Sequence, residues 1–355
     1  MGKTKIVCTI GPASRCEDVV EQLAREGMNI ARVNCSHGTT EEIRAIIKSL
    51  KKLRVEKQLD YEIMLDTKGP DIRIGKIKNG QVELVTGQEF ILSTKDCEGG
   101  ITCVTVPYPD NFAEKLKRGQ VILVDDARLK LVVVEVKGAN VITNVEIGGT
   151  LKRRKSLYVP GVDFEMPFLS EVDKEDITMG VEESVDMIAA SFVSSAKDVN
   201  ELRDFCVMVR ANVCRYKMGT NDDVRIISKI ENNLSITNLD EIIDASYGVM
   251  VARGDLGVAF PLEMIPPLQK MIIRRTKESG KFVIVATEMM ESMTYSPRPT
   301  RAEVSDVANA VWDSACAVML SGETARGHWP IECVKVMKSI VATAEKYFVK
   351  NPSVK

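Results

Sequence analysis

Short apolar runs recur along the chain, without the alternation of polar and apolar residues that marks a half-exposed strand. Strands that are apolar on both faces are typical of a parallel sheet covered by helices. We therefore expect a strand in each of eight runs: TKIVCTIG (4–11), MNIARVN (28–34), EIMLDTKG (62–69), DMIAASFV (186–193), RIISKIE (225–231), YGVMVARGDLG (247–257), FVIVATEM (282–289) and CAVMLSGE (316–323).

The segments between these runs carry apolar residues three and four positions apart, which predicts amphipathic helices. Six such helices are expected, at 17–27, 40–54, 196–210, 261–280, 301–314 and 330–348. A hydroxyl residue followed three positions later by Glu can cap a helix start from both sides. Three such pairs predict helix starts: Ser14 with Glu17, Thr39 with Glu42, and Thr300 with Glu303.

Strands that alternate with helices fit either a (β/α)8 TIM barrel or a doubly wound open sheet. In seven of the eight runs the chemically capable residues stand at the carboxyl end. A barrel brings all those ends to one mouth, whereas an open sheet gathers only one or two, so the pattern favours the barrel. The residues are Arg32 and Asn34, Asp66 and Lys68, Ser191, Lys229 and Glu231, Arg253 and Asp255, Thr287 and Glu288, and Ser321 and Glu323.

Residues 71–163 break this rhythm with short strand-like runs bounded mostly by Gly, Asp or Asn, and with no long helical pattern. They predict an all-β domain inserted after barrel strand 3. Such an insertion can be an inert addition or a lid that keeps water from a barrel mouth. We expect a barrel of residues 1–70 and 164–350 with a β-rich lid domain of residues 71–163.

The composition of the chain excludes several kinds of site and ligand. The chain has only two histidines, His37 and His328, which argues against histidine-rich metal sites and most hydrolase triads. A net charge of −2 and 5% aromatic residues argue against nucleic-acid binding. Nine dispersed cysteines predict reduced thiols, and from the sequence pattern we expect neither a signal peptide nor a membrane span. We expect a soluble, cytoplasmic protein.

Lys229 and Glu231 are two residues apart on one predicted strand, so their side chains lie on the same side of it. With Asp255 from the next strand, two carboxylates could bind one Mg²⁺, leaving room for waters and a substrate phosphate. A buried ion-pair network without metal is the alternative. Gly254 could let the backbone approach an anion, and Arg32, Arg73 and Lys68 add positive charge.

Asn34, Ser36, Asp66 and Thr67 place four oxygen-bearing side chains at the ends of neighbouring strands. They could form a cage for a monovalent or divalent cation, although Asn, Ser and Thr also cap helices. Positive charge and metal around an anionic substrate are typical of phosphoryl transfer, where the protein mainly positions groups and neutralises charge.

Seven motifs resemble those of pyruvate kinase, in the same order and over essentially the whole chain: TKIVCTIGPAS, GMNIARVNCSHG, LDTKGPDIR, ISKIEN, MVARGDLG, SPRPTRAEVSDVANAV and LSGETARG. The resemblance implies a barrel interrupted by a β lid. It also implies transfer of the phosphoryl group of phosphoenolpyruvate to ADP, which gives pyruvate and ATP in the last step of glycolysis.

The resemblance assigns roles to particular residues of this chain. Lys229, Thr287 and Arg32 would be catalytic. Substrate binding would involve Arg32, Lys229, Gly254, Asp255 and Thr287. Mg²⁺ or Mn²⁺ would be bound by Glu231 and Asp255. The K⁺ ligands would be Asn34, Ser36, Asp66 and Thr67, with Asp71 in place of the usual Glu at the position linked to K⁺ dependence. Nucleotide contacts would be Asn34, Cys35, Ser36, His37, Arg73 and Lys155.

The chain also differs from the family pattern. The family usually has Asp at Tyr247, Gln at Glu288, Arg at Ser194, Gly at Ala127, Ser156 and Ser314, Asn at Tyr158 and His at Asn233. It normally continues beyond the last barrel helix into a C-terminal regulatory domain, which this chain would lack through a short gene or a shortened product. A homo-oligomer is implied, weakened if that domain is truly absent.

These differences leave an alternative open, in which a catalytically silent relative binds nucleotide or phosphoenolpyruvate as a sensor or partner module. A lyase or aldolase barrel acting on phosphoenolpyruvate would leave the lid and Lys155 unexplained.

Overall fold

The computed structural model describes residues 4–162, 164–214 and 224–350. Residue 163, where the predicted lid ends, and the side chain of Cys214 lie outside the described residues. The chain divides into two compact units. The first comprises Met1–Gly69, Leu169–Leu256 and Leu262–Lys355, and the second comprises Pro70–Phe168 with Gly257–Pro261.

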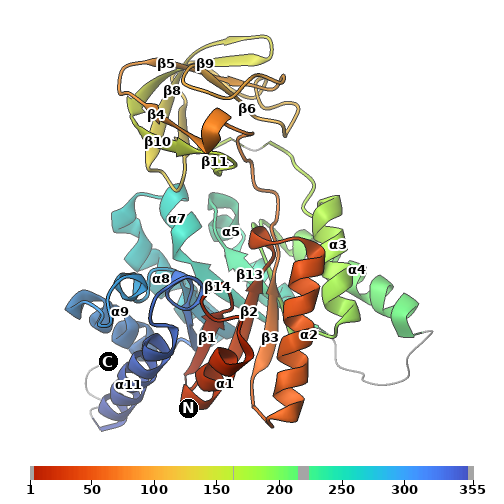
Figure 1. Ribbon diagram of the computed structural model, residues 1–355, viewed down its shortest axis with the longest axis vertical. Helices are drawn as coiled ribbons and strands as arrows, with labels where there is room; N and C mark the ends of the chain where they lie inside the picture. Colours follow the sequence, from red (N-terminus) through yellow and green to blue (C-terminus); the bar gives the residue numbers. More distant parts are fainter. Residues whose placement is uncertain (1–3, 163, 215–223, 351–355) are drawn as a thin grey trace. The chain divides into compact units, whose positions relative to one another are not determined.

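The first unit is a closed barrel of eight parallel strands, as the sequence predicts (Figure 1). The first and last strands, β1 and β16, pair with each other, so the ring has no open edge. Each of the eight predicted runs contains one of the strands: β1 (Lys5–Thr9), β2 (Ile30–Asn34), β3 (Glu62–Asp66), β12 (Met187–Ala190), β13 (Arg225–Ile230), β14 (Gly248–Ala252), β15 (Phe282–Ala286) and β16 (Ala317–Leu320).

The barrel interior is packed with apolar side chains rather than open as a pore. Its core contains Met64, Met187, Met250 and Met319 together with smaller aliphatic residues, all buried. Methionine is flexible enough to fill an irregular interior. The strands are therefore held rigidly, and only the residues at their ends remain for binding and chemistry.

All six predicted helices are present around the barrel (Figure 1). They are α1 (Glu17–Glu26), α2 (Thr40–Glu56), α4 (Ala196–Cys214), α8 (Ile265–Glu278), α9 (Arg301–Trp312) and α11 (Pro330–Lys350). The sequence pattern missed a longer helix, α3 (Glu171–Glu182), and four short ones: α5 (Asn233–Thr237), α6 (Leu239–Ala245), α7 (Arg253–Ala259) and α10 (Gly322–Ala325). None of the described helices is long and apolar enough to cross a membrane.

Two of the three predicted capping pairs are confirmed. Thr39 with Glu42 caps α2, and Thr300 with Glu303 caps α9, each with both reciprocal hydrogen bonds. The pair Ser14 with Glu17 is wrong, because α1 begins after Cys16 without a side-chain cap. The Ser14 hydroxyl instead accepts a hydrogen bond from the Gly11 amide, which shapes the turn after β1.

The second unit is rich in β-structure and follows barrel strand β3 in the chain, as expected. Its six-stranded sheet has the order β11-β7-β8-β9-β5-β6, and β10 pairs with β4 in a separate ribbon. Buried aromatic and aliphatic residues such as Phe90, Phe112 and Leu131 form its own core. The strands are β4 (Gln81–Leu84), β5 (Glu89–Ser93), β6 (Cys103–Thr105), β7 (Val121–Val124), β8 (Leu129–Lys137), β9 (Asn140–Ile147), β10 (Gly149–Lys152) and β11 (Leu157–Tyr158).

Candidate active site

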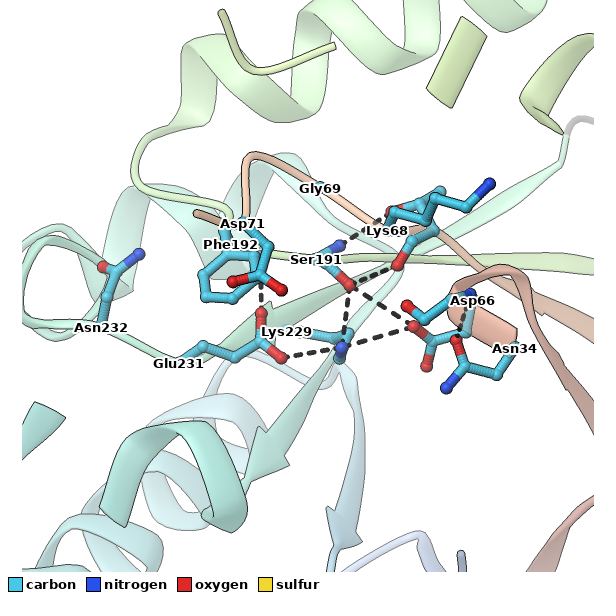
Figure 2. Close-up of polar contacts among 12 residues, drawn as sticks. Asn34, Asp66, Lys68, Gly69, Asp71, Ser191, Phe192, Lys229, Glu231 and Asn232 are labelled. Carbon is cyan, nitrogen blue, oxygen red and sulfur yellow. Dashed lines mark hydrogen bonds and ion pairs between the residues drawn. The ribbon is translucent and has the colours of Figure 1, made fainter. Parts of the chain in front are cut away.

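Lys229 near the end of β13 is the centre of a buried polar network at the carboxyl ends of the barrel strands (Figure 2). Its Nζ lies 2.7 Å from Oε1 of Glu231 and 3.3 Å from Oδ1 of Asp66. It also donates a hydrogen bond of 2.8 Å to Oγ of Ser191. Side chains from β13, β3 and the end of β12 therefore meet at one ammonium group.

The charges in this network perturb one another strongly. Burial by itself lowers the pKa of Lys229, but the carboxylates of Asp66, Glu231 and Asp255 outweigh burial and hold that pKa well above its ordinary value. Lys229 is thus a fixed positive charge at neutral pH. Burial raises the pKa of Glu231 above its ordinary value, and this rise is opposed by Lys229 and reinforced by Asp255.

Asp66 joins Lys229 to a second buried cation. Nε of Arg32 donates a hydrogen bond of 2.6 Å to Oδ2 of Asp66, and Nη1 of Arg32 donates one of 3.0 Å to Oγ1 of Thr9. Burial would raise the pKa of Asp66, but Arg32 and Lys229 outweigh it and hold the pKa below its usual value. The carboxylate therefore stays ionised and fixes both cations in place.

The candidate cation cage lies beside this network. Asn34 and Asp66 face each other as register partners on the parallel strands β2 and β3. Oδ1 of Asn34 accepts a hydrogen bond of 3.0 Å from the Ser36 amide, and Oγ1 of Thr67 accepts one of 3.1 Å from the Ser191 amide. The structure thus gathers all four predicted residues at the ends of two adjacent strands, with residues 35–37 forming a short 3-10 turn directly after β2.

Gly254 and Asp255 stand in the first turn of α7, directly after β14. A Cβ atom added to Gly254 would come within 3.0 Å of the Thr287 side chain, so the two positions are neighbours. Thr287 follows β15 and has a left-handed backbone with φ of 73°, and Glu288 has φ of 55°. Non-glycine residues rarely adopt this conformation, and consecutive examples are found where the surrounding structure enforces them.

Arg253 enforces the backbone at Thr287. Its guanidinium donates hydrogen bonds to the carbonyl oxygens of Ala286 and Thr287 at 3.2 and 3.0 Å. The other side of the group forms an ion pair of 2.6 Å with Asp306 on α9. Arg253 therefore connects the ends of β14 and β15. Glu288, where the family usually has Gln, is exposed.

Two predicted nucleotide contacts belong to the second unit. Arg73 pairs with Ser156 in an isolated β-bridge, and the amide of Ile74 donates to the carbonyl of Lys155 at 3.0 Å. Nζ of Lys155 lies 2.6 Å from Oδ1 of Asp125. Arg73 and Lys155 are therefore brought together within that unit.

Sequence reasoning missed two contributors to the site. Thr9, at the end of β1, accepts a hydrogen bond from Arg32. The amide of Phe192, directly after Ser191, donates one of 2.6 Å to Oε2 of Glu231. For both residues, the sequence indicates only that they stand at the end of a strand. The amino-acid type of Phe192 gives no further indication, because its role depends on its backbone amide.

Tyr247, where the family usually has Asp, lies away from the candidate site. Tyr247 precedes β14, so it lies at the amino end of the strands, opposite the site. Its ring packs near Phe282, 6.0 Å away between centroids, and beneath the guanidinium of Arg225 at 5.2 Å.

Ser194, where the family usually has Arg, is fixed by hydrogen bonds of its backbone. Its amide donates to Asp198 at 2.7 Å, and its carbonyl accepts from Asn238 at 2.8 Å.

A closed eight-stranded barrel with two buried cations and clustered carboxylates at its carboxyl ends defines a (β/α)8 protein whose site suits an anionic ligand and a cation. Residues 1–334 match the family model described as "Pyruvate kinase, barrel domain". The chain belongs to the pyruvate kinase family.

Curated relatives named "Pyruvate kinase" agree with this assignment. The chain is 46% identical to the protein of Sporosarcina psychrophila, with 97% of this chain and 57% of the relative covered. It is 44% identical to that of Bacillus licheniformis, with 98% and 58% covered. For Staphylococcus aureus strain MRSA252 the identity is 45%, with 97% and 57% covered. The chain thus spans less than three fifths of the length of these relatives.

Proposed function

We propose that this protein transfers the phosphoryl group of phosphoenolpyruvate to ADP, giving pyruvate and ATP. The observation that carries the proposal is the buried Lys229, held by Asp66, Glu231 and Ser191 at the barrel mouth. Phosphoryl transfer needs preorganised positive charge where the phosphoryl oxygens pass. Phosphorus NMR of the purified chain with phosphoenolpyruvate, ADP, Mg²⁺ and K⁺ tests it, since ATP signals appear only if transfer occurs.

In this proposal Lys229 and Arg32 contact the phosphoryl group. Their charges are fixed by one carboxylate, Asp66, so little reorganisation is needed when the group moves. The amide of Gly254 and the hydroxyl of Thr287 bind the substrate carboxylate. These two positions are neighbours across the ends of β14 and β15, which gives one anionic group two donors.

Glu231 and Asp255 fit a Mg²⁺ or Mn²⁺ ion. Oε1 of Glu231 is buried, and apart from Nζ of Lys229 it has no partner among the described residues. No cluster of three or more His, Cys, Asp or Glu side chains in the described part of the chain is placed to hold a metal. Two carboxylates leave coordination positions for water and a substrate phosphate, as Mg²⁺ sites usually do. Such an ion supplies positive charge to the phosphoryl and enolate oxygens.

Asn34, Ser36, Asp66 and Thr67 fit K⁺ better than a divalent ion. Asp66 is the only charged member and already pairs with two cations. The side-chain oxygens of Asn34 and Thr67 each accept one hydrogen bond and keep a second lone pair for a cation.

After transfer, the substrate is left as an enolate that must take a proton at carbon. Thr287 is the proposed proton relay, acting through water, because its hydroxyl belongs to the residue that Arg253 holds. The proposed nucleotide contacts are Asn34, Cys35, Ser36 and His37, together with Arg73 and Lys155.

We further propose the domain limits 1–70 and 164–350 for the barrel and 71–163 for the lid, a cytoplasmic location and a homo-oligomeric state. The change from one compact unit to the other after Gly69 supports the first of these limits, while the return to the first unit falls after Phe168.

A further inference from the structure

Two cysteines of the second unit interact through their side chains, outside the proposed active site. Cys97 follows β5, and Cys103 begins β6. The Sγ of Cys103 donates to the carbonyl oxygen of Glu98, the residue next to Cys97, at 3.6 Å. The hydroxyl of Thr105 lies 3.6 Å from the Sγ of Cys97. Because Cys103 and Thr105 are two apart on β6, their side chains share a face, and this places both thiols on one side of that strand.

The local backbone holds the two residues in this arrangement. The amide of Cys97 donates to Oγ1 of Thr105 at 3.1 Å, and the amide of Gly100 donates to the carbonyl of Cys103 at 2.8 Å. Gly99 packs so closely on Lys76 that an added Cβ would lie 2.1 Å from the Lys76 carbonyl oxygen. The loop from 97 to 103 is therefore pinned at both ends and in its middle.

The pair also differs from the other cysteines in accessibility. Cys97 and Cys103 are both partly exposed, so a small reagent can reach them. Cys8 and Cys333 also interact with each other, but both are fully buried. Among the cysteines whose side chains are described, Cys97 and Cys103 are the pair that combines contact with access.

The ionisation of the Cys103 thiol sets the order of reaction. Burial, followed by the hydrogen bond and charge of the Cys97 thiol, raises the pKa of Cys103 to about 11. Cys103 therefore stays protonated at neutral pH, which makes it the resolving thiol rather than the attacking one, since the thiolate is the reactive form.

We propose that Cys97 and Cys103 form a dithiol site for thiol–disulfide exchange with low-molecular-weight disulfides. The Cys97 thiolate attacks one sulfur of the small disulfide, forming a mixed disulfide and releasing one small thiol. Cys103 then loses its proton and attacks the Cys97 sulfur, releasing the second small thiol. One protein dithiol and one small disulfide thus give one protein disulfide and two small thiols.

The test uses the reduced 355-residue chain and glutathione disulfide, followed by acid quenching, alkylation of remaining thiols and peptide mass spectrometry. Trypsin leaves both cysteines on one peptide, because the next basic residues are Lys95 and Lys115. A protease that cuts after Glu98 separates them, unless a disulfide joins the two pieces. We expect the joined pieces, a loss of two hydrogen atoms, no retained glutathione, and release of the pieces by reductant.

Single substitutions make the test specific. In Cys103→Ser, the mixed disulfide on Cys97 has no resolving thiol, so glutathione should be retained there. Cys16, the exposed cysteine among those whose side chains are described, is the internal control, and it should retain glutathione as well. Retained glutathione on Cys97 in the wild-type chain, or alkylated Cys97 and Cys103 under conditions that modify Cys16, would overturn the proposal. If the Cys103→Ser variant does not fold, the peptide masses of the wild-type chain alone decide between these outcomes.

Discussion

Oδ1 of Asp66 lies 3.3 Å from Nζ of Lys229, so a buried carboxylate on β3 pairs with a buried ammonium group on β13. The other oxygen of Asp66 pairs with Arg32 at 2.6 Å. One negative charge therefore holds two cations at the ends of three barrel strands. If that charge is removed, both cations stay buried with less negative charge beside them, and this destabilises the fold because little water is present to solvate them.

Asp66→Asn should therefore destabilise the barrel by about 3–5 kcal/mol, the usual cost of breaking a buried ion pair. Urea unfolding followed by circular dichroism measures the change. Asp60→Asn makes the same chemical change at an exposed position and should be nearly neutral. Equal stability of the two variants would show that the pairing around Asp66 does not matter for the fold.

Arg253→Lys should lower kcat at least about tenfold, equivalent to about 1.4 kcal/mol of barrier. A lysine cannot reproduce the forked hydrogen bonds to Ala286 and Thr287 together with the ion pair to Asp306. Arg253 is a positioning residue, so the KM for phosphoenolpyruvate should rise while the KM for ADP stays unchanged. Arg274→Lys, at an exposed position, is the matched control. A uniform change in both KM values would point to general loss of structure instead.

Ser314→Gly should stabilise the chain by about 1 kcal/mol, because Ser314 has φ of 73°, a conformation that favours glycine. Ser314 follows the end of α9, where its amide bonds to Val311 and the next amide bonds to Ala310. These are the bonds of a Schellman cap, whose usual residue here is glycine. Thermal unfolding provides the measurement. The same change at the helical Ser305 should instead destabilise, and a loss of stability at both positions would refute the argument.

Glu303→Gln should destabilise α9 by about 1 kcal/mol at neutral pH, with the effect disappearing in acid. Burial would raise the pKa of Glu303, but hydrogen bonds from Ser292 and Thr300 outweigh it and lower the pKa. Its stabilisation is therefore present above the unfolded pKa of about 4.3 and is lost as pH falls through the lower folded value. Urea unfolding at neutral pH and near pH 3 tests this. A difference that is the same at both pH values would contradict it.

The sequence predicted the barrel well, because a strand buried on both faces has to be apolar along its whole length. It also predicted that Lys229 and Glu231 share a side, since strand geometry alone requires it. It could not predict α3, where Asp173 and Asp176 are buried and break the apolar pattern. Their partner is distant in the chain: Lys68 forms an ion pair of 2.5 Å with Asp176, and its amide donates to Asp173.

Other features also depend on tertiary context. Tyr247 is adjacent in sequence to a strand that carries site residues, yet it lies at the amino end of that strand, away from the site. Ser14 has the spacing of a cap, yet its hydroxyl is used by the turn at Gly11. The role of Arg253 depends on carbonyl groups from β15, which no local pattern reveals.

The proposed phosphoryl transfer depends on the positive charge of the buried Lys229. It is tested most directly by measuring pyruvate formation from phosphoenolpyruvate and ADP, with Mg²⁺ and K⁺ present, for the wild-type chain and for Lys229→Met. Loss of one preorganised cationic group at a transition state typically costs about a hundredfold or more. We expect turnover by the wild-type chain and a decrease of at least that size in the variant. A wild-type rate no higher than that of Lys229→Met would contradict the account, and calorimetric binding of either ligand would then favour a silent binding module.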